Sequence, residues 1–182
     1  MNNSKKILYV GCGFSIPGHH QGPKFNENNR YFCADIKSWQ SQTGRCYYKN
    51  LPLEIKKHSH LIWSDGKKLS IKSNSMNEVH AHNVLGDPNI SSKRKYLFLD
   101  EMLRVLNNTG TIFIGETVTP QVYPLNILEN FAMLENLSFT YLLTPKNSNS
   151  IEIKNAKEIM GGFAVTKDKL DEKSYLIAFK KK

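Results

Sequence analysis

The feature that most constrains this chain is an apolar run that ends in two glycines, followed by a second apolar run that ends in a carboxylate. Residues 7–10 (Ile-Leu-Tyr-Val) lead into Gly11-x-Gly13, and residues 31–34 (Tyr-Phe-Cys-Ala) lead into Asp35 about twenty residues further on. Short apolar runs that end at glycine are typical of buried parallel strands. A turn with little side-chain bulk lets the backbone approach a ligand, and a carboxylate after the next strand accepts hydrogen bonds from a ribose. The pair therefore predicts a nucleotide-type cofactor site in a doubly wound α/β sheet.

The glycine turn departs from the dinucleotide-binding fingerprint. That fingerprint has a third glycine at the position where this chain has Ile16. Because a pyrophosphate needs close backbone approach and a helix N-terminus, the missing glycine argues against NAD or FAD. A tight strand-to-loop connection without a ligand is the alternative interpretation of Gly11 and Gly13.

The composition fits one globular domain. The chain has 182 residues, of which 40% are hydrophobic, enough for a core without disulfides or metals. We expect a single domain over residues 1–182, with a cofactor half at 6–118 and substrate-side and C-terminal strands at 119–182. No apolar run reaches the roughly 18 residues of a membrane span, no signal-peptide core follows Met1, and three cysteines without a CxxC pair suit a reducing compartment. These features predict a cytoplasmic protein with no membrane partner.

The basic charge raises the question of a nucleic-acid partner. The formal net charge is +9, but it comes from 21 lysines and only 4 arginines. Arginine is the preferred residue for bidentate phosphate contacts, and the lysines are dispersed apart from short pairs and the tail at 180–182. A solvated basic surface is the favoured interpretation, and RNA binding is the alternative.

The rest of the chain alternates between strand-like and helix-like segments. Apolar residues recur at helical spacing over 93–106, and a second helix pattern covers 125–137. We expect a loop or a short strand over 37–60 and a short helix over 153–160. Further strand-like runs lie at 61–66, 76–85, 111–114, 139–143 and 174–179.

Four of these segments resemble, in order, motifs of the class I S-adenosylmethionine-dependent methyltransferases. Residues 7–13 resemble the glycine-rich first motif, and Asp35 resembles the acidic residue that binds the ribose hydroxyls. Asp65, in Ser-Asp-Gly, is similar to the acidic residue that meets the adenine amino group. Residues 101–114 resemble the helix-turn-strand near the end of the cofactor domain. The resemblance covers residues 6–118, nearly two-thirds of the chain.

The resemblance implies both a fold and a cofactor. The fold is α/β, a Rossmann-like doubly wound sheet of about seven mostly parallel strands with an antiparallel C-terminal strand and helices on both faces. The cofactor is S-adenosyl-L-methionine. The cofactor-binding residues that it implies are Gly11, Cys12, Gly13, Asp35, Ile36, Asp65, Gly66 and Asn83. For Asp35 and Asp65, the alternative role is to cap a helix or form a turn after a strand.

The chain departs from the family after the first motif. The family commonly has an acidic residue where this chain has Tyr9, and a third glycine where it has Ser15. The helix that usually follows is replaced by a loop at 14–29, which contains His19 and His20. These departures leave open a non-catalytic member of the family.

Histidines supply the candidate catalytic groups. Methyl transfer from a sulfonium mainly requires alignment of the nucleophile with the methyl group, and a hydroxyl nucleophile also needs a base. In the family the fourth strand ends beside the methyl group, and here that segment contains His80 and His82, which share one face of a strand. His82 lies nearer the carboxyl end, and an ordinary pKa near 6.5 suits a base. It is our candidate base, with a hydrogen-bonded strand-end histidine as the alternative.

The remaining polar residues near the predicted site are assigned to the substrate. We expect His19, His20 and Glu116 to bind it, and exposure to solvent is the alternative for the two histidines. His58 and His60 lack acidic or cysteine partners at ligand spacing, so we expect no metal site. The sequence thus predicts a methyltransferase for a small-molecule acceptor. The alternatives are an RNA-modifying methyltransferase and a non-catalytic binding or scaffold protein of the same fold.

Overall fold

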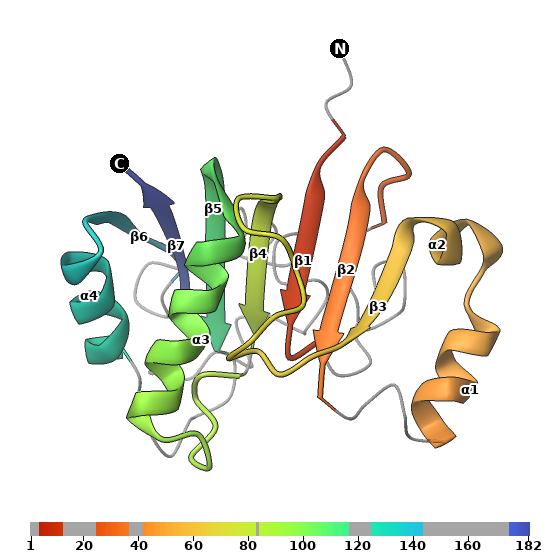
Figure 1. Ribbon diagram of the computed structural model, residues 1–182, viewed down its shortest axis with the longest axis horizontal. Coiled ribbons are helices and arrows are strands. Elements are labelled where there is room, and N and C mark those ends of the chain that lie inside the picture. The colour runs from red at the N-terminus through yellow and green to blue at the C-terminus, as the bar shows by residue number, and fades with distance from the viewer. Residues whose placement is uncertain (1–3, 13–24, 37–41, 83, 117–124, 144–174) are drawn as a thin grey trace.

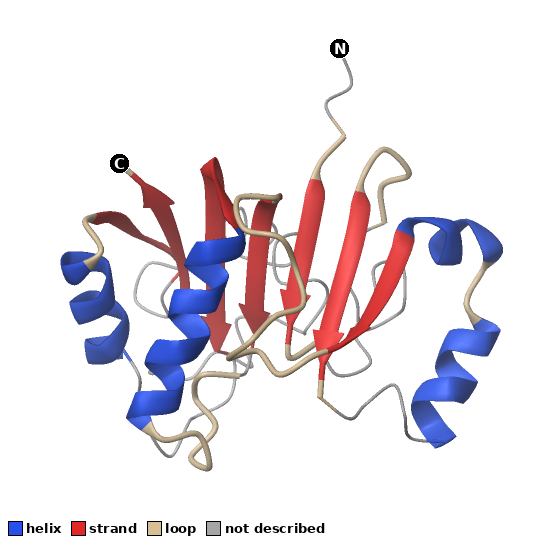
Figure 2. Ribbon diagram, in the orientation of Figure 1, coloured by secondary structure: helices blue, strands red, loops and turns tan. Residues whose placement is uncertain are grey.

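A computed structural model of the chain describes residues 4–12, 25–36, 42–82, 84–116, 125–143 and 175–182. It consists of a seven-stranded sheet in the order β3-β2-β1-β4-β5-β7-β6, with helices packed against it (Figures 1 and 2). The strands are β1 (Lys6–Val10), β2 (Arg30–Asp35), β3 (Ser59–Trp63), β4 (Met76–His82), β5 (Leu106–Glu116), β6 (Leu137–Leu143) and β7 (Tyr175–Lys181). The helices are α1 (Gln42–Asn50), α2 (Leu53–His58), α3 (Ser92–Val105) and α4 (Leu125–Leu134).

The strand directions confirm the predicted architecture. Strands β3, β2, β1, β4 and β5 pair in parallel, whereas β7 runs antiparallel to both β5 and β6. The chain builds outward from β1 in two directions, to β2 and β3 on one side and to β4 and β5 on the other. The strand order therefore reverses at β1 and β4, and ligands of open α/β sheets bind at the carboxyl ends of the strands at such a point.

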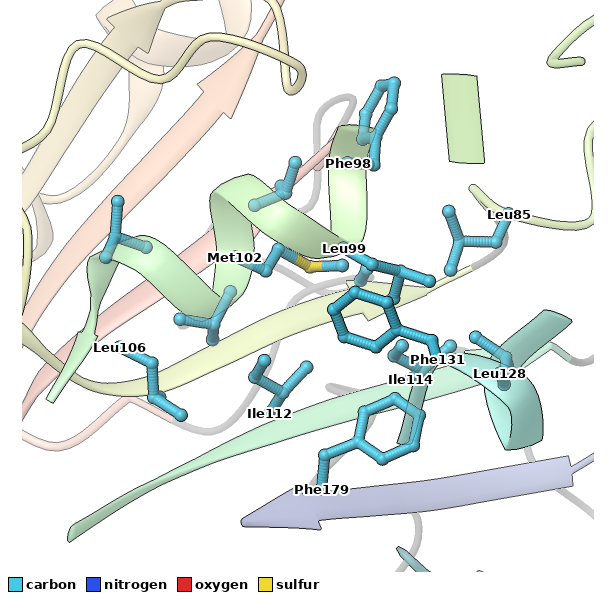
Figure 3. Packing of buried hydrophobic residues seen from close by; sticks show 14 of the residues in the cluster. Leu85, Phe98, Leu99, Met102, Leu106, Ile112, Ile114, Leu128, Phe131 and Phe179 are labelled. Carbon is cyan, nitrogen blue, oxygen red and sulfur yellow. The ribbon is translucent and has the colours of Figure 1, made fainter. Parts of the chain in front are cut away.

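One face of the sheet carries the main core under α3 and α4 (Figure 3). Helix α3 buries Phe98, Leu99 and Met102 at the helical spacing expected from the sequence, and α4 adds Leu128 and Phe131. Strand side chains on this face meet them; those in the cluster are Leu8, Val10, Ala34, Met76, Val79, Ala81, Leu106, Ile112, Ile114, Leu137, Ile177 and Phe179. Burying each leucine-sized side chain contributes about 1.5–3 kcal/mol, so this layer fixes the strands that carry the site.

The opposite face is covered at β2 and β3 by the segment that contains α2. Leu51 and Ile55 are buried there and pack against Phe25 and Leu61. Phe25 and Leu61 also contact a second cluster, formed by Ile7, Tyr9, Cys12, Tyr31 and Cys33. Helices thus pack on both faces, as predicted.

The segment 37–60 differs from the sequence prediction. We expected a loop or a short strand, but residues 42–50 and 53–58 are the helices α1 and α2. The described side chains of α1, at 45, 46 and 48–50, are exposed, so these positions form no buried apolar stripe. Helix α2 shows only Ile55 as a buried residue, and its position depends on the tertiary contact with Leu61.

The turn predicted after α3 lies within strand β5. Strand β5 begins at Leu106, immediately after the helix, and pairs there with Met76. The next registered pair joins Thr111 to Glu78, so residues 107–110 bulge out opposite a single residue of β4. The predicted helix over 153–160 lies outside the described residues. None of the described helices is long and apolar enough to cross a membrane.

Candidate cofactor and acceptor site

Gly11 forms the turn at the carboxyl end of β1, and only glycine fits there. Its φ is +63°, in the left-handed region that disfavours side chains. A Cβ at this position would lie 2.6 Å from Cγ2 of Val84, which follows β4. The Gly11 N–H donates to the carbonyl of Ala34 at 2.8 Å. The turn after β1 therefore touches the segment after β4 and lies beside the end of β2.

Asp35 closes β2 next to that turn. Its carboxylate is half-buried, and its carbonyl accepts a hydrogen bond from the N–H of Ser64 at 3.2 Å. This bond links the end of β2 to the segment after β3. Ile36 follows with an exposed fraction of 44%, which leaves an apolar side chain open to a ligand beside the carboxylate. Both residues thus lie at the end of β2 beside the turn at Gly11, and their assignment to the cofactor stays a prediction.

Asp65 and Gly66 have structural roles in the segment after β3. Asp65 accepts a hydrogen bond from the N–H of Lys67 at 3.0 Å and pairs with its Nζ at 2.9 Å. Burial alone raises the pKa of Asp65, but these bonds and the charges of Lys67 and Arg94 lower it overall. A side chain at Gly66 would collide with the ring of Phe98. Their assignment to the cofactor stays a prediction.

Cys12 is a buried thiol. Its side chain is near Cys33, and its Sγ lies 3.7 Å from the carbonyl oxygen of Ala34. The hydrogen bond with Cys33 and burial raise the pKa of Cys12 well above its ordinary value. A thiol held in its protonated form is a poor nucleophile, so Cys12 contributes packing and backbone to the turn.

A line of charged and polar side chains follows β4 on the face opposite the main core. Nζ of Lys5 lies 2.7 Å from Oε1 of Glu78. The other carboxylate oxygen, Oε2, lies 3.1 Å from Nε2 of His80. Nδ1 of His80 in turn lies 3.3 Å from Nε2 of His82. The line runs from the half-exposed Lys5 at the amino end of the strand to the buried His82 at its carboxyl end.

Aromatic rings from the neighbouring strands hold His80 in place. The register places Tyr9 of β1 and Phe113 of β5 on either side of it. Both ring centroids lie 4.8 Å from that of His80, with interplanar angles of 32°. Tyr9 thus replaces the family's usual acidic residue with a group that packs on the histidine.

Glu78 and His82, the first and last residues of β4 in this line, differ in charge state. Burial raises the pKa of Glu78, but the hydrogen bonds from His80 and Lys5 and their charges outweigh it and lower the pKa to about 2. Burial, and then the charge of His80, lower the pKa of His82 well below its ordinary value. At neutral pH, Glu78 is therefore ionised and His82 is neutral.

Several predicted site residues remain untested. Gly13, His19, His20 and Asn83 lie outside the described residues. The backbone of Glu116 ends β5, paired with Tyr175, and its side chain is outside the described part. Among the described residues, no group of three or more histidine, cysteine, aspartate or glutamate side chains is placed to hold a metal ion.

Glu78 and Lys5 are the site residues that the sequence reasoning missed. The alternation in Glu78-x-His80-x-His82 places all three side chains on one face of a strand. That spacing was the available signal for Glu78. The contact with Lys5 joins residues 73 positions apart, and the sequence gives no indication of it.

The fold has close counterparts among solved structures, although no family model and no curated protein matches the sequence. A TehB-like SAM-dependent methyltransferase from Corynebacterium glutamicum superposes with a TM-score of 0.63 at 14% identity, over 99% of this chain and 82% of that one. The glycopeptide N-methyltransferase MtfA gives 0.68 at 8% identity, over 99% and 84%. The 4+2 cyclase SpnF gives 0.59 at 14% identity, over 98% and 75%. The chain therefore has the fold of the class I S-adenosylmethionine-dependent methyltransferases.

Proposed function

We propose that this protein is an S-adenosylmethionine-dependent methyltransferase that acts on a small-molecule acceptor. The observation that carries the proposal is the contact between the ends of β1 and β2. Gly11 adopts a left-handed turn with no room for a side chain, and its N–H binds the carbonyl of the residue before Asp35. Bare backbone thus lies beside a carboxylate, as a nucleoside-type ligand requires.

The residues present fit the cofactor. The backbone of Gly11 and Cys12 would lie against its amino-acid part, Asp35 would accept hydrogen bonds from the ribose hydroxyls, and Ile36 would contact the adenine ring. S-adenosylmethionine, when bound, supplies a methyl group on a positively charged sulfur. A complex of MtfA with sinefungin is also among the similar structures, with a TM-score of 0.66 at 8% identity, over 99% of this chain and 81% of that one.

His82 is the proposed base for the acceptor. It is neutral at pH 7, it lies at the carboxyl end of β4, and the segment that follows it contacts the Gly11 turn through Val84. A neutral imidazole there can accept a proton from an acceptor placed beside the cofactor. The same position brings the proposed base and the cofactor turn to one edge of the sheet.

A small-molecule acceptor is favoured over RNA by the surface chemistry. The chain has 4 arginines against 21 lysines, and arginine is the residue that binds phosphate in a bidentate manner. A cytoplasmic location remains part of the same proposal.

Calorimetric titration with S-adenosylmethionine tests the cofactor assignment. We expect binding by the parent protein and a loss of roughly 10- to 100-fold in affinity for Asp35→Asn, because each hydrogen bond to a charged group contributes about 1.5–3 kcal/mol. Asp100→Asn is the matched control, since Asp100 is an exposed carboxylate on α3. Absence of heat with the parent protein would contradict the proposal and favour a non-catalytic protein of this fold.

A further inference from the structure

The hydrogen bonds along β4 determine where the protons of the two histidines lie. An ionised Glu78 can only accept, so Nε2 of His80 carries the proton in their 3.1 Å contact. When His80 is neutral, its Nδ1 carries a lone pair, and Nε2 of His82 then donates to it across 3.3 Å. The lone pair of neutral His82 is therefore on Nδ1.

That lone pair is buried and has no protein partner in the described part of the chain. Nδ1 of His82 makes no hydrogen bond among the described residues, and the residue as a whole is only 9% exposed. An unpaired buried acceptor destabilises the folded protein unless a ligand satisfies it. Because it lies at the end of the strand where the acceptor is expected, it points to a ligand group that donates a hydrogen bond.

We propose that Glu78, His80 and His82 form a proton relay, and that the acceptor is a hydroxyl compound whose proton is taken by Nδ1 of His82. The inference rests on the proposed methyltransferase function and specifies its substrate class. A carboxylate acceptor has no proton to give, and an ammonium group would have to be buried beside the positive charge that the relay must carry.

Methyl transfer to the acceptor oxygen releases one proton, which the histidines take up. A lone pair of the acceptor oxygen forms the bond to the methyl carbon, the carbon–sulfur pair stays with the sulfur, and the pair of the O–H bond stays on the oxygen. The released proton goes to Nδ1 of His82. The proton on Nε2 of His82 moves to Nδ1 of His80, so His82 becomes neutral again and the positive charge rests on His80.

The surroundings of His80 are suited to that charge. The Glu78 carboxylate is hydrogen-bonded to it, and Tyr9 and Phe113 present their rings on its two sides. The other titratable group that packs against the ring is the phenol of Tyr9, and burial raises the pKa of Tyr9 well above its ordinary value, so it stays neutral. Lys5, on the far side of Glu78, is half exposed and screened by water.

Long-range ¹⁵N–¹H NMR of histidine-labelled protein tests the relay without cofactor or activity. At pH 7 we expect His82 to be a neutral ring that carries its proton on Nε2. The six histidines are assigned by single substitutions. A His82 ring protonated at Nδ1 would overturn the relay, because its lone pair would then face His80 and not the acceptor.

His80→Phe supplies the second arm, because phenylalanine keeps an aromatic ring between Tyr9 and Phe113. It removes the acceptor for Nε2 of His82, so we expect His82 to become a mixture of both tautomers. His60→Phe is the matched control, since His60 is exposed on β3 and stacks on Phe32. An unchanged His82 tautomer in His80→Phe would contradict the relay. The proposed methyltransferase function is tested separately, by the calorimetric titration with S-adenosylmethionine.

Discussion

Nδ1 of His80 lies 3.3 Å from Nε2 of His82, so two histidines on alternate positions of one strand share a hydrogen bond. Their rings meet edge to face, with centroids 5.5 Å apart and an interplanar angle of 63°. His80 also contacts Glu78 through its other nitrogen. Because both ring nitrogens of His80 and Nε2 of His82 have defined partners, the charge state of Glu78 affects the proton positions further along the strand.

Glu78→Gln should lower the free energy of unfolding by up to ~3 kcal/mol at pH 7. The pKa of Glu78 falls from 4.5 to about 2 in the folded protein, and each pKa unit corresponds to about 1.4 kcal/mol. A lowered carboxylate pKa stabilises the fold above pH 4.5, and this contribution disappears as the pH falls towards 2. Urea unfolding at pH 7, 5, 4 and 3 should therefore show the difference between parent and variant shrinking below pH 4.5.

Glu54→Gln is the matched control for this experiment. Glu54 also pairs with a lysine, Lys57 at 2.8 Å, but both side chains are more than half exposed. Such a pair contributes little in water, so the unfolding midpoint should not change measurably. A Glu78→Gln effect that stays constant from pH 7 to pH 3 would contradict the ionised, hydrogen-bonded carboxylate.

His82 should make the protein less stable as the pH falls below about 6.5. Burial lowers the pKa of His82 in the folded state, so the unfolded chain binds protons more readily in this range. The direction is the same as for Glu78, but the window lies higher. In His82→Gln the slope of unfolding free energy against pH between 7 and 5 should decrease. His60→Gln, on the exposed side of β3, should retain the parent slope, and equal slopes in all three proteins would exclude a buried neutral His82.

Gly11→Ala should both destabilise the protein and weaken S-adenosylmethionine binding. An alanine at φ +63° costs about 1–2 kcal/mol, and its Cβ would lie 2.6 Å from Cγ2 of Val84. The double variant Gly11→Ala/Val84→Ala separates the two causes, because it relieves the contact but keeps the backbone strain. Thermal unfolding should show that Gly11→Ala costs less stability in the Val84→Ala background than in the parent protein. A Gly11→Ala protein as stable as the parent would refute the left-handed turn.

Much of the sheet could be predicted from the sequence because its central strands are buried on both faces. Residues 7–10 and 31–34 are nearly continuous apolar runs, and such runs indicate parallel strands whatever their partners are. The register of β1 and β2 then sets Val10 beside Ala34, which brings Gly11 and Asp35 together without further information. The proximity of Gly11 and Asp35 therefore follows from the pairing of β1 with β2.

Other parts depend on contacts that no sequence pattern encodes. The described side chains of α1 are exposed, and α2 buries only Ile55, whose contact with Leu61 is a tertiary one. The role of Glu78 likewise follows from its neighbours, since Lys5 and His80 are what keep it ionised. The contact between Gly66 and the ring of Phe98 is likewise tertiary, and the assignment of Gly66 to the cofactor stays a prediction.

Arg104→Lys should lower the free energy of unfolding by about 1–2 kcal/mol although it keeps the charge. Arg104 binds Glu101 with both Nε and Nη2 at 2.8 Å. Its guanidinium also donates to the carbonyls of Leu69 at 3.0 Å and Ile71 at 2.9 Å. Lysine cannot reproduce this planar set of donors, so the carbonyls between Gly66 and β4 lose partners. Urea unfolding at pH 7 measures the change, and Arg94→Lys, on the exposed part of α3, should leave the midpoint unchanged. If the two variants are equally stable, the guanidinium does not hold the segment that leads into β4, and the placement of Glu78 must depend on the sheet alone.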